Sequence, residues 1–196
     1  MPLPYRRPAA VAVALGICCL AAAQSSGLSA STWAGAGLDG RLDALGYEVT
    51  GVPVMTGAEL AYDVSLPADF SGGLALGGMY VRRDGHLEDE RFTARAWRFT
   101  VSPELGYRAS DQLRLRAGVE IRSAADVAAF DLRFEDNVRA HLRLGGDYAL
   151  TDGLAVTAAV SRLIGDGGDI DNLVDPGRSV RLGLRHRLTT RNRDEG

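Results

Sequence analysis

The chain has 196 residues, a formal net charge of −3 and two cysteines, both close to its beginning. This length suits a single domain, and the slightly acidic balance excludes a general electrostatic attraction to nucleic acid. All 22 residues in the combined lysine and arginine count are arginine, so every such cation can form forked, bidentate pairs with carboxylates or phosphates.

The first 23 residues have the pattern of a cleaved export signal. Arg6 and Arg7 precede an almost wholly apolar stretch, 9–20, and three alanines at 21–23 fit the small-residue cleavage pattern. The apolar stretch is too short to span a bilayer as a helix. Lipid attachment at Cys18 or Cys19 is an alternative, but the residue before each is unsuitable. We expect cleavage before Gln24, which leaves 196 − 23 = 173 residues and no cysteine.

The rest of the chain contains eight stretches in which apolar and polar residues alternate. In the clearest one, Leu142 and Leu144 interleave with His141 and Arg143. A period of two is the period of a β-strand with one apolar face and one polar face. In chain order, strands are predicted at 31–42, 56–66, 73–83, 94–107, 113–123, 137–150, 154–163 and 178–188. The predicted domain plan is therefore a short segment at 24–30, a barrel at 31–188 and a polar tail at 189–196.

The connections between these strands alternate between short and long. Tight turns with Gly, Asp, Pro or Ser are predicted at 67–72, 109–112 and 151–153. Longer loops are predicted at 43–55, 84–93, 124–136 and 164–177. Short turns at one end and long loops at the other are typical of barrels in bacterial outer membranes, where the long loops face outward.

Two environments are compatible with the alternation. A soluble periplasmic barrel of the lipocalin kind would place the apolar faces inside, whereas a membrane barrel would turn them to lipid. Aromatic residues near the strand ends favour the membrane: Tyr80 and Trp97 lie toward the long loops, and Tyr107 and Tyr148 lie toward the short turns. The predicted fold is an all-β, eight-stranded antiparallel up-and-down transmembrane β-barrel in the bacterial outer membrane.

The polar faces carry charges of both signs. An eight-stranded barrel is only wide enough to hold its own side chains, and buried charges must be paired. A tight turn joins the fourth and fifth strands, which predicts that Glu104 and Arg116 lie close together. The predicted interior network comprises Glu59, Asp63, Arg98, Glu104, Arg116, Glu120, Arg139, His141, Arg143, Asp147, Arg181 and Arg185.

The arrangement of strands, turns and loops resembles the small eight-stranded outer-membrane proteins of Gram-negative bacteria, of the OmpA transmembrane-domain and opacity-protein type. The resemblance covers nearly the whole mature chain and rests on architecture rather than on a motif. It implies outer-membrane lipids, lipopolysaccharide and the outer-membrane assembly machinery as partners. One departure is that the final strand ends at Leu188 rather than at the aromatic residue usual in such proteins.

The predicted role is structural or surface-interacting, with a largely plugged interior, an unidentified extracellular ligand and no catalytic residue, metal or cofactor. A lipid-A-modifying enzyme is one alternative, although the residues two after each histidine are Glu88, Arg143 and Leu188, not the serine of the deacylase pattern. A narrow channel is another alternative. His86 lies in an acidic segment, and the oxygen-rich loop from Gly165 to Asp175 could hold calcium, but ordinary solvated loops have the same composition.

Two arginines stand out on the apolar faces. Arg82 and Arg162 each lie eight residues beyond the start of a strand's apolar face, at Leu74 and Leu154. Eight strand residues tilted by about 40° rise roughly 20 Å, close to the top of an apolar band about 25 Å tall. Rim arginines can extend toward water, and guanidinium groups suit phosphates. We therefore expect Arg82 and Arg162 to bind lipid A phosphates.

Overall fold

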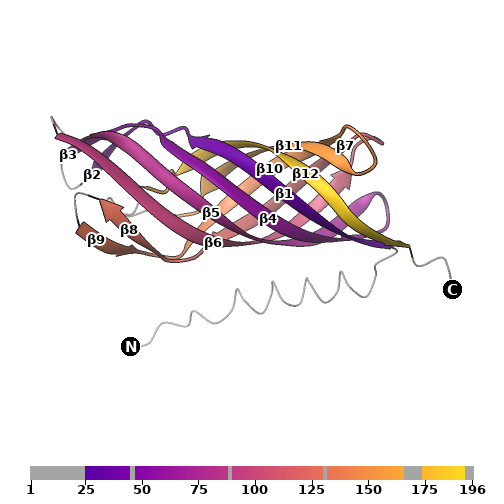
Figure 1. The fold of residues 1–196 in the computed structure, drawn as a ribbon. Coiled ribbons are helices and arrows are strands. Elements are labelled where there is room, and N and C mark those ends of the chain that lie inside the picture. Colours follow the sequence, from indigo (N-terminus) through magenta and orange to yellow (C-terminus); the bar gives the residue numbers. More distant parts are fainter. Residues whose placement is uncertain (1–24, 45–46, 88–89, 130–131, 166–173, 193–196) are drawn as a thin grey trace, which may run out of the picture.

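The computed structural model describes residues 25–44, 47–87, 90–129, 132–165 and 174–192. Among these residues no helix is long and apolar enough to cross a membrane. Eight long strands close into an antiparallel barrel (Figure 1). They are β1 (Ser25–Gly37), β4 (Pro53–Ser65), β5 (Phe70–Leu87), β6 (Glu90–Arg108), β7 (Leu113–Arg122), β10 (Arg139–Ala149), β11 (Leu154–Leu163) and β12 (Arg178–Asn192). The predicted all-β barrel of eight strands is confirmed.

Each long strand pairs with its neighbours in chain order, and β1 pairs with β12 to close the barrel. Two short hairpins extend the sheet at the end of the long loops. They are β2 (Arg41–Ala44) with β3 (Tyr47–Thr50), and β8 (Ala125–Ala129) with β9 (Leu132–Asp136). β3 pairs with β5 and β8 pairs with β6, so the hairpins flank the β5–β6 extension (Figure 1).

Several predicted boundaries are wrong. The segment 84–93 was predicted as a long loop, yet β5 and β6 continue through it and leave only residues 88–89 between them. β1 begins at Ser25 rather than at residue 31 and ends at Gly37, because its register follows β4 and β12 rather than its weak Gly- and Ala-rich pattern. β12 runs to Asn192, so strand structure extends beyond 31–188 into both flanking segments. The turn predicted at 109–112 has these bounds, whereas the other two occupy 66–69 and 150–153 rather than 67–72 and 151–153, because β5 already begins at Phe70 and β10 ends at Ala149.

The apolar faces point away from the barrel interior. Leu144 and Leu182 are exposed, whereas Arg143 and Arg181, their neighbours along the chain, form ion pairs inside. Other exposed apolar side chains include Leu60, Leu74, Leu76, Phe99, Leu105, Leu115, Ile121, Val156, Val160 and Leu184. A soluble barrel would have the opposite arrangement. The burial pattern therefore suits a barrel surrounded by lipid.

The strand register fixes the height of the apolar band. We start at Tyr107 of β6 and move from each residue to its partner on the next strand, once around the barrel. This circuit returns to β6 at Trp97, which is ten residues from Tyr107 in the direction of the long loops. Ten residues of stagger over eight strands require a strand tilt of about 40°. At about 3.3 Å per residue, the vertical distance from Tyr107 to Trp97 is roughly 25 Å, the height of the apolar band in outer-membrane barrels.

Above the level of Trp97, the pattern of the β5 and β6 walls reverses. Val81 and Phe92 are buried, while the alternate residues Arg82 and Asp84 are exposed. The buried side chains form an apolar core with residues of β3, β8 and the loop before β12: Val49, Ala125, Val127 and Val174. The end of the molecule that carries the long loops is therefore packed like a soluble protein.

We predict that an arginine at mid-height on the lipid-facing surface blocks assembly. The circuit that defines the band passes through Gly146 of β10. Leu144 lies two residues above Gly146, close to the middle of the apolar band. An arginine at the bilayer midplane costs about 2–4 kcal/mol, and near the interface about 0–1 kcal/mol. Leu144→Arg should therefore reduce the folded fraction in vesicles, measured by heat-dependent gel mobility, far more than Leu150→Arg beside the tight turn. Equal folding of the two variants would contradict the assigned lipid face.

Candidate functional site

The main feature of the barrel interior is an unbroken series of ion pairs that runs from the short turns to the long loops. Acidic and basic side chains alternate along it, and each consecutive pair is in contact. In order, the series is Asp63, Arg116, Glu104, Arg143, Glu120, Arg122, Asp175, Arg98, Asp136 and Arg139. Residues of five strands (β4, β6, β7, β9 and β10) and of the loop before β12 are thereby joined in one network.

Arg116 organises the end of the network near the short turns. Its guanidinium nitrogens lie 3.0 Å from Asp63, 3.2 Å from Glu104 and 2.6 Å from Asp147. Arg185 adds a contact of 3.3 Å with Asp147. The predicted neighbours Glu104 and Arg116 are therefore in direct contact. The Arg116 guanidinium thus links β7 to β4, β6 and β10. A lysine ammonium is compact and lacks the directional donors of the guanidinium fork, so it could not make the same set of contacts.

Arg143 has the same role at mid-height. It lies 2.8 Å from Glu59, 3.4 Å from Glu104 and 3.5 Å from Glu120. Arg181 donates to Glu120 at 2.6 Å. Carboxylates that face one another across the barrel are thus separated by guanidinium groups, which offsets the high cost of burying each charge alone.

Trp33 supplies the aromatic part of this middle level. The Arg181 guanidinium carbon lies 4.1 Å from the centre of the Trp33 ring, a cation–π arrangement. Trp33 is buried although it comes from the Gly- and Ala-rich β1. The missing Cβ of Gly57 makes room for it, because a Cβ there would lie 2.4 Å from the Trp33 ring.

Asp175, from the loop before β12, closes the upper end of the network. Its carboxylate pairs with Arg122, lies 3.5 Å from Arg98 and is 3.7 Å from His141. Although burial alone would raise the pKa of Asp175, Arg122 and His141 hold that pKa well below its ordinary value. Arg98 and Arg139 also pair with Asp136 at the end of β9. The long-loop end is therefore fixed to the barrel by two buried aspartates.

The predicted interior residues all lie within this network, but the prediction lacked three members. Arg122 lies in the predicted strand 113–123 but not in the predicted network, and Asp136 lies in the predicted loop 124–136. Asp175 was considered only as part of a calcium-binding loop, and its position inside the barrel argues against that role. The other oxygen-rich positions, 166–172, lie outside the described residues. No group of three or more His, Cys, Asp and Glu residues within the described part is placed to hold a metal ion.

Arg82 and Arg162 both lie on the outer surface, at different heights. Arg82 is two residues beyond Tyr80 and so lies about 27 Å above Tyr107, whereas the register places Arg162 at about 19 Å. Each faces a second exposed arginine across the strand pair: Arg95 opposite Arg82, and Arg178 opposite Arg162. Asp84 pairs with Arg82, and Asp39 pairs with Arg178. Among the described residues, no carboxylate pairs with Arg95 or Arg162.

We predict that removing the Asp175 charge strongly destabilises the barrel. Asp175→Asn leaves Arg122 and Arg98 without a compensating charge, and breaking a buried pair in this way costs about 3–5 kcal/mol. The free energy of unfolding should be measured by urea titration in vesicles. Asp84→Asn, which breaks the exposed pair with Arg82, is the matched control and should change little.

The pH dependence gives a second check on Asp175. A depressed folded-state pKa means that its stabilisation is present above its ordinary pKa of 3.8 and is lost as the pH falls toward the folded-state value. The difference between wild type and Asp175→Asn should therefore be full at neutral pH and shrink in acid. A difference that grew on acidification would contradict the ion pairing described here.

Comparison with solved structures returns several similar chains of low sequence identity. Matches include the attachment invasion locus protein Ail of Yersinia pestis (13% identity, TM-score 0.46, covering 85% of this chain and 99% of Ail). They also include neisserial surface protein A (13%, 0.47, 84% and 97%) and OprG of Pseudomonas aeruginosa (11%, 0.49, 85% and 97%). No curated protein matches the chain. The family model described as "Outer membrane protein beta-barrel domain" matches residues 10–184. The chain therefore belongs to the outer-membrane protein β-barrel domain family.

Proposed function

We propose that this protein is a non-catalytic outer-membrane barrel with a structural and surface-interacting role, whose interior is closed to solutes. The observation that carries the proposal is the unbroken series of ion pairs from Asp63 to Arg139. Because each charge in the series contacts the next across the narrow interior, a solute would have to break buried pairs in order to pass. Interactions would then take place at the outer surface and the long-loop end.

The two alternatives gain no such support. For a channel, a cavity of about 500 Å³ does open at the short-turn end, but its lining includes Asp147, which pairs with both Arg116 and Arg185. For a lipid-A-modifying enzyme, the strand histidine His141 lies inside the barrel beside Asp175, away from a lipid substrate. His86 and His186 are exposed, and neither has a serine two residues later.

The outer surface supports a specific contact with lipid A. Arg95 and Arg162 each lie near the upper edge of the apolar band, and each has a second arginine directly opposite. Two neighbouring guanidinium groups, of which an aspartate pairs with one and no carboxylate of the described residues pairs with the other, suit a phosphate at the membrane interface. The arginines that pair with an aspartate are Arg82, with Asp84, and Arg178, with Asp39. The proposal therefore includes two lipid A phosphate sites, Arg82 with Arg95 and Arg162 with Arg178.

The closed interior is tested by conductance in planar bilayers. The wild-type barrel should give no steady conductance steps, because the ion pairs fill its cross-section. The double variant Glu104→Ala/Arg143→Ala removes one charge of each sign near mid-height, keeps the net charge, and should conduct more than wild type. Steady steps from the wild-type protein would overturn the closed-interior proposal.

The phosphate sites are tested by retention of lipid A on the folded barrel. Arg95→Gln combined with Arg162→Gln should weaken lipid A binding by about tenfold or more, because each of these guanidinium groups offers a charge-assisted hydrogen bond worth about 1.5–3 kcal/mol. Arg108→Gln, at the opposite end of β6, is the matched control and should bind like wild type. Unchanged retention by the folded double variant would refute the two phosphate sites.

A further inference from the structure

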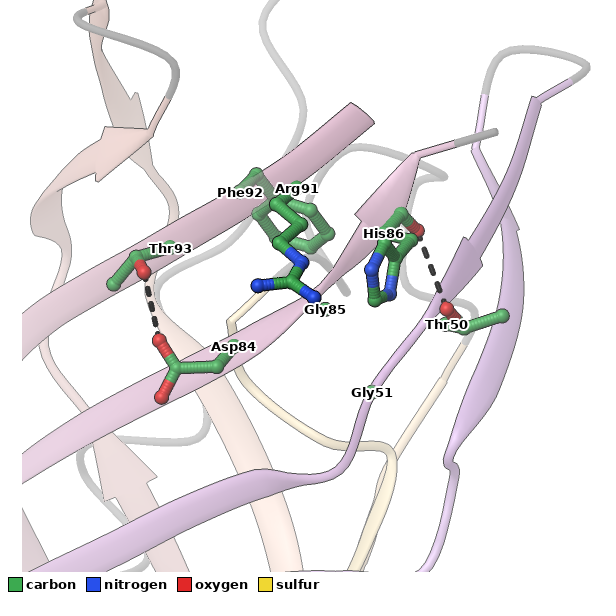
Figure 2. A pocket seen from close by; sticks show the side chains of 8 residues that line it. All are labelled: Thr50, Gly51, Asp84, Gly85, His86, Arg91, Phe92 and Thr93. Carbon is green, nitrogen blue, oxygen red and sulfur yellow. Dashed lines mark hydrogen bonds between the residues drawn. The ribbon is translucent and has the colours of Figure 1, made fainter. Parts of the chain in front are cut away.

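A hollow of about 460 Å³ lies at the long-loop end, where β3 meets β5 and β6 (Figure 2). Thr50 from β3, Asp84 and His86 from β5, and Arg91 and Thr93 from β6 surround it. Its volume is within the range of small-ligand sites and exceeds what a single phosphate needs. The series of interior ion pairs does not include any of these five residues.

Two glycines line the hollow where the backbones on either side of it approach closely. Gly51 has a φ of +112°, and a Cβ on it would lie 2.3 Å from the Asp84 carbonyl oxygen. A Cβ on Gly85 would lie 1.8 Å from the Thr50 carbonyl oxygen. The backbones of β3 and β5 therefore approach each other directly at this point, with no side chain between them. The lining therefore includes two positions without a side chain, where the backbone of Gly51 and Gly85 faces a ligand.

Arg91 provides the unused charge of the hollow. Within the described part of the chain no carboxylate pairs with its guanidinium, while Asp84 is already held by Arg82 and by the Thr93 hydroxyl at 2.7 Å. His86 lies directly across the strand pair from Arg91. In Figure 2 the Arg91 guanidinium and the His86 imidazole both point into the hollow. A ligand would thus meet one cation that no carboxylate of the described residues holds, one imidazole and an already oriented carboxylate.

The strand register relates the hollow to the membrane. His86 is on the same face of β5 as Tyr80 and Arg82, and Arg91 is on the same face of β6 as Trp97 and Arg95. Six residues separate Tyr80 from His86, a rise of roughly 15 Å at the tilt of this barrel. The hollow therefore lies directly above the aromatic edge of the apolar band. In an outer membrane, this level outside the lipid is occupied by the core saccharide of lipopolysaccharide.

We propose that the hollow binds a phosphorylated or carboxylated sugar of the lipopolysaccharide core. Arg91 pairs with the phosphate or carboxylate of the sugar, and His86 donates a second hydrogen bond to the same group. Asp84, Thr93 and the exposed backbone bind the sugar hydroxyls. The inference rests on the membrane orientation in the proposed function, but not on the arginine pairs at the lipid A phosphates.

The test compares the binding of two lipids to the folded full-length barrel: lipopolysaccharide with its core, and lipid A without a core. Wild type should bind the core-bearing lipid more tightly. Arg91→Gln should reduce that binding about tenfold and leave lipid A binding unchanged, and His86→Gln should act in the same direction. Arg108→Gln, which removes an exposed arginine at the other end of β6, should behave like wild type.

Competition identifies the ligand. Released core oligosaccharide should displace the core-bearing lipid at concentrations at which inorganic phosphate does not. Equal displacement by phosphate would overturn the assignment to a sugar, and equal affinity of Arg91→Gln, His86→Gln and wild type for the core-bearing lipid would overturn the site. If lipid A binding survives Arg95→Gln/Arg162→Gln while core binding depends on Arg91, the lipid A part of the proposed function fails and this inference stands.

Discussion

The pairing of buried charge inside a narrow barrel is the constraint on which the rest of this structure depends. Lipid surrounds the outer face, so the polar face of every strand must turn inward, where eight strands leave little room for water. Each charged group must then contact an opposite one. Guanidinium groups meet this demand because one fork can bind several carboxylates. Arg116 and Arg143 each contact three acidic residues.

The same pairing couples the long-loop end to the barrel. Asp175 and Asp136 belong to segments outside the eight long strands, yet their carboxylates reach Arg98, Arg122 and Arg139 inside. The apolar core above the membrane level packs against the same region. The long-loop end therefore has an apolar core like that of a soluble protein, and ion pairs join this end to the barrel interior. A fixed interior of this kind leaves the outer surface as the place where binding can vary, and both the arginine pairs and the hollow lie there.

Alternation along the chain determined much of the fold. Leu144 beside Arg143, and Leu182 beside Arg181, already separate a lipid face from an inner face. Turn residues at 66–69, 109–112 and 150–153 set three of the connections. The predicted contact between Glu104 and Arg116 could be made because a tight turn fixes the register of β6 and β7. Local patterns suffice wherever the partner lies on the next strand.

Only the tertiary structure determined two kinds of feature: contacts between residues far apart in the sequence, and strands that pass from one environment to another. The segment 84–93 looks like a polar loop because the apolar face switches from outside to inside above the membrane, where Phe92 packs inward and Asp84 faces water. A single period cannot reveal such a switch, since the pattern records only which residues are apolar. The link from Arg122 to Asp175 spans 53 residues, and only closure of the barrel with the loop folded into its mouth brings these two charges together.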